Sequence, residues 1–200
     1  MSGQNKVSGV VLAGGLARRM GRQDKGLIPF NDQPLVCYAL AAMEPLVDEL
    51  FISANRHQES YSKFGFRVIE DRNSDFDGPL AGILAAMQSA SNPLLLISPC
   101  DSPLVKTAHL QRLLETLNNN TEIDIAVAFD GERLHPVFAA IKTKLQADLQ
   151  QYLESGERKL QKWFDRHSVI KVDYKDTPNI FTNINTPEEL LLLEQASEHE

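Results

Sequence analysis

The stretch that decides the fold runs from Val7 to Gly26 and reads VSGVVLAGGLARRMGRQDKG. Its first part, Val7–Ala13, is a short apolar run rich in branched side chains, which is typical of a buried strand. A glycine-rich, basic segment follows at once. In open α/β sheets, ligands bind beyond the carboxyl ends of the strands, where a loop of this kind leaves the sheet. The stretch therefore predicts an α/β sheet whose ligand-binding edge begins near Gly14.

Four more apolar runs repeat the strand pattern further along the chain, at Leu50–Ala54, Arg67–Ile69, Leu94–Ser98 and Ile123–Phe129. Between them lie segments with apolar residues at the helical spacing i, i+3, i+4 and i+7; these are Leu80, Ile83, Leu84 and Met87, then Leu110, Leu113, Leu114 and Leu117. Because alternating strands and helices need crossover connections, the helices cover both faces of a mainly parallel sheet. We predict a doubly wound α/β fold in one domain spanning residues 1–200.

The second half of the chain departs from this alternation. Ile123–Phe129 and Leu134–Ile141 flank an Asp130-Gly131 pair, which favours the positive φ angles of a tight hairpin turn. A local antiparallel hairpin is therefore expected beside the parallel strands. Further helices are indicated by the apolar spacing from Leu145 to Leu153 and by Thr186-Pro187-Glu188-Glu189, where Thr, Pro and Glu occupy the positions of a capping box.

The composition excludes several classes of protein. A formal net charge of −7 argues against a surface that tracks phosphate backbones, so we expect no nucleic-acid partner. Two cysteines, Cys37 and Cys100, without a CxxC pair, indicate neither a disulfide framework nor a cysteine-rich zinc site. The polar first residues lack a secretory signal, and no run reaches the ~20 apolar residues that cross a bilayer. We expect a cytoplasmic monomer without a membrane partner.

The loop after the first strand has the properties of an anion cradle. Residues 14–26 hold four of the eleven glycines and a local charge of four positive against one negative, inside an acidic chain. Bare glycine amides can approach phosphate oxygens closely. The alternative is a flexible connection with solvated basic residues. Neither a Walker A motif nor GxGxxG is present, so the loop predicts a different triphosphate-binding fold.

Asp101 follows the apolar run Leu94–Ser98 and lies at the carboxyl end of a predicted central strand, on the same edge as the glycine loop. A carboxylate there can hold Mg²⁺ against triphosphate oxygens, because this ion is bound by few carboxylates plus substrate phosphates. Asp101 is therefore the candidate metal ligand. The alternative is an ordinary turn or helix-cap aspartate.

Two further polar groups follow strands on this edge. Asp71 ends the third strand and could accept hydrogen bonds from a base or ribose, or be a solvated strand-end carboxylate. Asn55-Arg56-His57 follows the second strand and could equally begin a surface helix. His109 lacks metal-ligand spacing and is expected to be an exposed helix residue.

Gly78 begins the helix that contains Leu84, so that helix N-terminus could receive a second anion, although plain helix initiation explains the motif as well. Asn183 and Asn185 precede the predicted capping box. Their amides fall on one side of an extended segment, where they could bind a polar ligand or merely serve the cap.

In order along the chain, these motifs resemble those of the molybdenum cofactor guanylyltransferases, a family of nucleotidyltransferases with the fold of the nucleotide-diphospho-sugar transferases. The loop is similar to the signature LAGGxxxRMGxDK, with one residue more between Gly21 and Asp24 than its shortest variant. The resemblance extends over nearly the whole chain and includes Asn55-Arg56-His57-Gln58, Asp71, Gly78-Pro79-Leu80-Ala81-Gly82, Pro99-Cys100-Asp101-Ser102-Pro103, Asp130-Gly131-Glu132-Arg133 before His135-Pro136, Gly156-Glu157-Arg158 and Asn183-Ile184-Asn185-Thr186-Pro187.

The resemblance implies roles for individual residues. It implies that Asp101 binds both nucleotide and magnesium, and that GTP is bound by Leu12, Ala13, Gly14, Lys25 and Asp71. An asparagine of the family aligns with Ser53 here, so that contact passes to Ser53 or to nearby Asn55. Catalytic or molybdopterin-side roles are implied for Gly15, Arg19, Gly78, Asn183 and Asn185, with Gly15 also a nucleotide-binding candidate.

The implied reaction joins GMP from GTP to the terminal phosphate of molybdenum-bound molybdopterin and releases pyrophosphate. Lys25, Arg19 and magnesium at Asp101 would stabilise the charge that develops on the α-phosphate and the leaving pyrophosphate. GTP and molybdenum-molybdopterin are then the substrates, with transient contacts to proteins that deliver molybdopterin and to molybdoenzyme chaperones. The sequence leaves open a cytidylyltransferase or sugar-phosphate nucleotidyltransferase of the same fold, and a noncatalytic nucleotide-binding module.

Overall fold

The computed structural model describes residues 5–14, 16–17, 23–71 and 78–197. In this part of the chain a seven-stranded sheet has the order β11-β9-β10-β8-β1-β6-β7. Its strands are β1 (Val7–Leu12), β6 (Glu49–Ser53), β7 (Arg67–Ile69), β8 (Leu94–Pro99), β9 (Ile125–Phe129), β10 (Leu134–Lys142) and β11 (Val169–Asp173). All neighbours pair in parallel except β10, which is antiparallel to both β8 and β9. The predicted doubly wound sheet with a local hairpin is confirmed.

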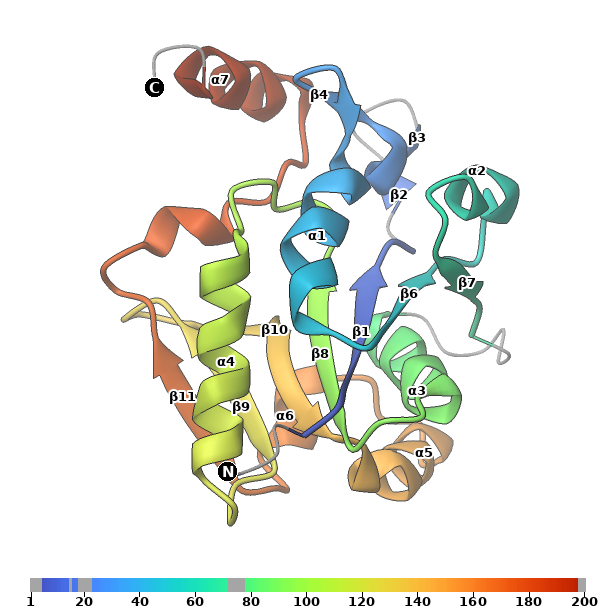
Figure 1. The fold of residues 1–200 in the computed structure, drawn as a ribbon, viewed down its shortest axis with the longest axis vertical. Coiled ribbons are helices and arrows are strands. Elements are labelled where there is room, and N and C mark those ends of the chain that lie inside the picture. The colour runs from blue at the N-terminus through green and yellow to red at the C-terminus, as the bar shows by residue number, and fades with distance from the viewer. Residues whose placement is uncertain (1–4, 15, 18–22, 72–77, 198–200) are drawn as a thin grey trace.

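Helices cover both faces of this sheet, as Figure 1 shows. The α-helices are α1 (Leu35–Met43), α2 (Gln58–Ser62), α3 (Pro79–Ser89), α4 (Thr107–Asn119), α5 (Gln146–Glu154), α6 (Leu160–Phe164) and α7 (Pro187–Ser197). Short 3₁₀ turns connect some of them: η1 (Lys25–Leu27), η2 (Glu44–Leu46), η3 (Thr143–Leu145) and η4 (Pro178–Phe181). Two small ribbons pair β2 (Leu16–Ala17) with β3 (Gln23–Asp24), and β4 (Pro29–Phe30) with β5 (Gln33–Pro34).

The core follows from the alternation of side chains along the strands. In β1, Val7 and Val11 belong to the cluster that packs under α1 and α4, whereas Val10 belongs to the cluster under α3, α5 and α6. The predicted apolar stripe of α4 is buried, with Leu110, Leu113 and Leu117 each 1% exposed. Burial of each such leucine contributes about 1.5–3 kcal/mol to the free energy of folding, so these apolar stripes hold the helices against the sheet.

Some boundaries and elements differ from the sequence prediction. The strand predicted to begin at Ile123 begins at Ile125, because Ile123 closes a turn by donating its amide to the Asn120 carbonyl. The hairpin turn has the expected geometry, with φ +100° at Gly131. The capping box is also confirmed: the Glu189 amide donates to Thr186 Oγ1, and the Thr186 amide donates to Glu189 Oε2. The sequence analysis did not anticipate α1, α6 or β11.

No helix in the described ranges combines the length and the hydropathy that crossing a bilayer requires.

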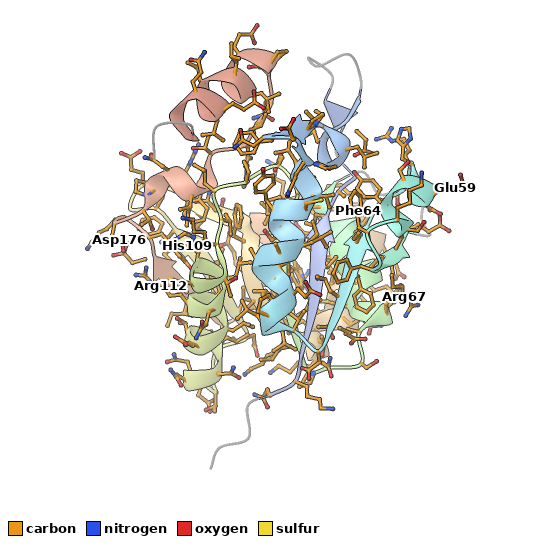
Figure 2. All side chains as sticks on the ribbon, turned by 45° about the horizontal axis from the view of Figure 1, so that its top comes forward. Glu59, Phe64, Arg67, His109, Arg112 and Asp176 are labelled. Carbon is orange, nitrogen blue, oxygen red and sulfur yellow. The ribbon has the colours of Figure 1, made fainter. Side chains whose placement is uncertain are left out.

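Figure 2 shows two groups of polar side chains on opposite flanks of the sheet: His109, Arg112 and Asp176 beside α4, and Glu59 with Arg67 beside α2 and β7. His109 was expected to be exposed, but it is half-buried in the first turn of α4, where its Nδ1 accepts the Lys106 amide proton. It acts as part of the helix cap.

Candidate active site

A cavity of about 520 Å³ opens at the edge where the parallel strands β1, β6, β7 and β8 end. Parallel strands bring their carboxyl ends to one side of a sheet, so segments distant in sequence converge there. The described lining comes from seven segments of the chain and consists of Leu12, Gly14, Ser53, Asn55, Arg56, Asp71, Gly78, Pro79, Gly82, Pro99, Asp101, Val137 and Asn183.

Lys25 and Asp101 form an ion pair beside this cavity. Lys25 Nζ lies 2.9 Å from Asp101 Oδ2 and 2.5 Å from Asn185 Oδ1. The side chains of Lys25 and Asp101 are only 17% and 11% exposed, so water screens their attraction less than it screens a surface pair. Three segments thus place one ammonium, one carboxylate and one amide at a single point.

The backbone around Asp101 is held from two sides. The Cys100 amide donates to the Leu12 carbonyl at 3.1 Å, which extends the β1–β8 pairing beyond the strands. On the other side, the Ile184 amide donates to the Asp101 carbonyl at 3.0 Å. Burial is the main cause that raises the pKa of the Cys100 thiol, so this cysteine is protonated and not a thiolate nucleophile.

Asn55 and Asp71 form a reciprocal pair at the other end of the cavity. Asn55 Nδ2 donates to Asp71 Oδ1 at 2.7 Å, and the Asp71 amide donates to Asn55 Oδ1 at 3.1 Å. This pair joins the ends of β6 and β7 and presents a carboxylate to the cavity. Arg56 Nη2 lies 3.4 Å from the Gly14 carbonyl and so connects the same wall to the loop after β1.

The N-terminus of α3 forms a third wall. Gly78 caps it with φ +116°, a conformation that favours glycine, and Pro79 occupies the first turn. The unpaired amides of a helix N-terminus favour anions. One turn further on, Gly82 allows the helix to approach β6, since a Cβ there would lie 2.6 Å from Ser53 Oγ.

The segment after η4 crosses the open edge of the sheet. Ser102 Oγ donates to Asn183 Oδ1 at 2.6 Å, so the NH₂ group is what Asn183 can offer to a ligand. Ile184, fully buried, packs with Ile28, Phe30 and Leu35 in a small separate cluster. Asn185 then faces Lys25, which means that this one segment contributes to both the cavity wall and the ion pair.

Residues 9–171 match the model described as the MobA-like NTP transferase domain. The chain belongs to the MobA-like NTP transferase family. It is similar to proteins named molybdenum cofactor guanylyltransferase: one from Shewanella loihica is 41% identical, covering 97% of this chain and 98% of the relative. Another from Shewanella piezotolerans is 42% identical, with coverages of 97% and 95%.

A solved structure shares the fold: molybdopterin-guanine dinucleotide biosynthesis protein A from Archaeoglobus fulgidus, with a TM-score of 0.78 and 21% identity. The match covers 96% of this chain and all of that one. At this identity the likeness supports the fold and no more, whereas the family rests on the sequence relatives.

The family resemblance had named thirteen candidate residues, and the structure brings most of them to one place. Eight line the cavity: Leu12, Gly14, Ser53, Asn55, Asp71, Gly78, Asp101 and Asn183. Lys25 joins the cavity through its ion pair with Asp101, and Asn185 joins it through its hydrogen bond with Lys25. Ala13 is fully buried, and its amide donates to the Ser53 carbonyl at 2.9 Å, so it supports the loop from below. Gly15 and Arg19 lie outside the described residues.

Sequence reasoning missed some of the site. Val137, on β10 next to a register shift between His135 and Ala139, lines the cavity although its apolar run signalled only a strand. A buried contact between Tyr61 and Asp24 also went unnoticed, because the two residues are 37 positions apart and neither belongs to a strand-end cluster. The helix that carries Tyr61 reads QESYS and is polar at all its other positions, so its sequence carries no signal of a buried contact.

Proposed function

We propose that this protein transfers GMP from GTP to the terminal phosphate of molybdenum-bound molybdopterin and releases pyrophosphate. The observation that carries the proposal is the Lys25–Asp101 ion pair beside a cavity large enough for a nucleotide. Its support comes from relatives 41–42% identical over nearly their whole length that bear the name molybdenum cofactor guanylyltransferase. The proposal includes a cytoplasmic location and transient contacts with proteins that supply molybdopterin or receive the product.

The cavity suggests how the substrates are oriented. Guanine presents two neighbouring donors, N1–H and the exocyclic amine, which suit the acceptor oxygens of Asp71 at one end. The triphosphate then extends towards Gly14 and Lys25, where a glycine backbone and a lysine ammonium can contact its oxygens. Asn183 and the N-terminus of α3 at Gly78 remain for the phosphate of the acceptor.

The reaction is an in-line displacement at the α-phosphorus of GTP. An oxygen of the acceptor phosphate forms the new bond to that phosphorus, while the bond to the bridging oxygen breaks and pyrophosphate leaves with its electron pair. The acceptor oxygen is already anionic, so the step needs neither a protein nucleophile nor a strong general base. What the chain supplies is orientation and positive charge, and Lys25 is placed to neutralise charge on the leaving group.

The donor set at Asp101 fits magnesium that is chelated by the triphosphate. Mg²⁺ is usually bound through one or two carboxylates plus substrate phosphates. Within the described ranges, no group of three or more His, Cys, Asp or Glu side chains could hold a metal ion by itself. Asp101, already holding the Lys25 ammonium, would hold the ion, which when bound would offset charge on the phosphate oxygens.

A four-nucleotide assay tests the proposal. Pyrophosphate release and the mass of the product are measured with GTP, CTP, ATP or UTP, magnesium and molybdenum-bound molybdopterin. Turnover with GTP well above the other three supports guanylyl transfer. A preference for CTP would make the protein a cytidylyltransferase. Tight GTP binding with no pyrophosphate above background would instead indicate a noncatalytic nucleotide-binding module.

A further inference from the structure

A buried tyrosine hydroxyl lies directly behind the loop that carries Lys25. Tyr61, on α2, is 0% exposed, and its hydroxyl donates to Asp24 Oδ1 at 2.5 Å. The Tyr61 hydroxyl oxygen also lies 3.4 Å from the carbonyl oxygen of Ala13, at the start of the loop after β1. A phenylalanine would fill the apolar space equally well, so the hydroxyl requires its own explanation.

Asp24 extends this contact to the turn that contains Lys25. The Asp24 residue is 4% exposed and directly precedes η1, the turn that begins at Lys25. The carboxylate therefore lies at the base of the Lys25 turn, and its hydrogen bond with the Tyr61 hydroxyl ties that turn to α2.

The fit at Gly26 is independent evidence for the close approach. A Cβ on Gly26 would lie 2.5 Å from the Tyr61 hydroxyl and 3.2 Å from Cε1 of its ring. The turn therefore rests directly on the tyrosine, and a side chain at position 26 would push it away. The Lys25 side chain, held by Asp101 and Asn185 at its tip, is thus held at its base as well.

We propose that Tyr61 is a positioning residue for Lys25: acting through Asp24, its hydroxyl fixes the turn from which the ammonium reaches Asp101. The inference rests on the proposed function in that Lys25 contacts the triphosphate there. A lysine has four rotatable side-chain bonds, and holding its backbone lowers the entropy lost when its ammonium binds a ligand. Burial of a carboxylate beside the hydroxyl is unfavourable in itself, which suits a contact kept for its geometry.

The first test reads the position of Lys25 without any ligand. The rate at which each lysine is acetylated by acetic anhydride is measured by mass spectrometry in the wild type and in Tyr61→Phe. An ammonium held by a carboxylate and an amide oxygen reacts slowly, so the variant should acetylate Lys25 several-fold faster, while exposed Lys175 serves as the internal reference. Equal Lys25 rates in the two proteins would overturn the proposal.

Two further variants separate positioning from packing. Asp24→Asn keeps an acceptor oxygen for the Tyr61 hydroxyl and should preserve the slow acetylation of Lys25, whereas Asp24→Ala should lose it. Tyr152→Phe is the matched control, because Tyr152 is 2% exposed and donates to the Lys159 carbonyl, away from the cavity. If Tyr61→Phe does not fold, the comparison of Asp24→Asn with Asp24→Ala decides alone: equal acetylation of Lys25 in these two variants contradicts the proposal.

A double-mutant cycle connects the inference to nucleotide binding. Tyr61→Phe should raise the Kd for GTP with magnesium roughly tenfold, and should change it little when Lys25 is already methionine. Independent, additive effects of the two substitutions would show that Tyr61 does not act through Lys25. The proposed function is judged separately, by wild-type turnover: binding that depends on Tyr61 without transfer of GMP would refute the reaction and leave the positioning role intact.

Discussion

Lys25 Nζ lies 2.9 Å from Asp101 Oδ2, although the two residues are 76 positions apart in the chain. The contact exists because a loop after β1 and a turn after β8 leave adjacent parallel strands at the same edge. It places a cation where a metal-bound triphosphate would need one, and it gives Asp101 a positive partner before any substrate arrives. We therefore expect Asp101 to exchange this partner for magnesium when the substrate binds.

Replacement of Asp101 by asparagine should abolish GMP transfer while the protein remains folded. The amide retains the size of the side chain but removes the negative charge that would hold magnesium and that orients Lys25. We expect kcat to fall by roughly 10²-fold or more, comparable to the loss of one electrostatic contact in other active sites. Steady-state pyrophosphate release measures the effect, and circular dichroism checks the fold. Near-normal kcat in Asp101→Asn would remove Asp101 from the reaction.

Lys25→Met should have two opposite effects on binding. GTP binding weakens because a positive charge is lost. In the free protein, however, the Asp101 carboxylate loses its partner, so its affinity for a divalent cation should rise. Mn²⁺ titration followed by electron paramagnetic resonance measures the second effect without turnover.

The control for that experiment is Lys162→Met, which removes one partner of the more exposed Lys162–Glu157 ion pair. It should change neither affinity, because surface ion pairs contribute only about 0–1 kcal/mol and this one is remote from the described lining of the cavity. Weaker Mn²⁺ binding in Lys25→Met than in the wild type would contradict the exchange of partners at Asp101.

Asp71→Asn should reduce selectivity for guanine. A carboxylate can accept from both N1–H and the exocyclic amine, whereas an amide offers only one acceptor oxygen. We expect GTP affinity to fall by about 1.5–3 kcal/mol, and the preference for GTP over ITP, which lacks the exocyclic amine, to shrink. Calorimetric titration with both nucleotides measures this. Glu70→Gln alters an exposed carboxylate one residue earlier that binds Gln58, and it should leave both affinities unchanged.

The sequence sufficed for those parts of the molecule whose causes are local. The strand–loop unit at Val7–Gly14, the Asp130-Gly131 hairpin and the Thr186–Glu189 capping box each depend on neighbouring residues, and each was predicted correctly. The meeting of Lys25 and Asp101 could also be expected, because parallel topology brings strand ends to a common edge.

Other features depend on contacts that no local pattern encodes. Helix α1 reads LVCYALAAM, and its less buried positions Cys37, Tyr38 and Ala41 are no more polar than its buried ones, so the sequence lacks the contrast between two faces that announces a helix. The Asn185–Lys25 hydrogen bond joins residues 160 positions apart in the chain. The Tyr61–Asp24 contact is set by how α2 packs, which the sequence spacing does not reveal.

Acid should weaken the hairpin at Asp130. The Arg133 amide, then the His135 ring and the Glu132 amide, donate to this carboxylate and hold its pKa well below its usual range. A folded-state pKa below the unfolded value of 3.8 stabilises the protein above that value, and the contribution is lost as pH falls through the folded-state pKa. The free energy of unfolding of Asp130→Asn should therefore lie below that of the wild type near neutral pH.

Urea unfolding at a series of pH values from about 7 down to about 2 measures this difference. The gap between the two proteins should narrow once pH falls below 3.8. A gap that stays constant over the whole range would mean that Asp130 stabilises the hairpin through shape and not through its charge.

Gly26→Ala should destabilise the protein through the Tyr61 hydroxyl. The new Cβ would lie 2.5 Å from that oxygen, which is fully buried, so the tyrosine or the turn must move. Overpacking of this kind costs about 1–3 kcal/mol, and for a chain of this size each kcal/mol lowers Tm by roughly 2–4 °C. Gly14→Ala is the matched control for Tm, because a Cβ there meets nothing within 4 Å. In a Tyr61→Phe background the obstructing oxygen is gone, although ring carbons remain at 3.2 and 3.3 Å, so Gly26→Ala should lower Tm less there than in the wild type. An equal loss of Tm in the two backgrounds would show that the strain at position 26 does not come from the hydroxyl.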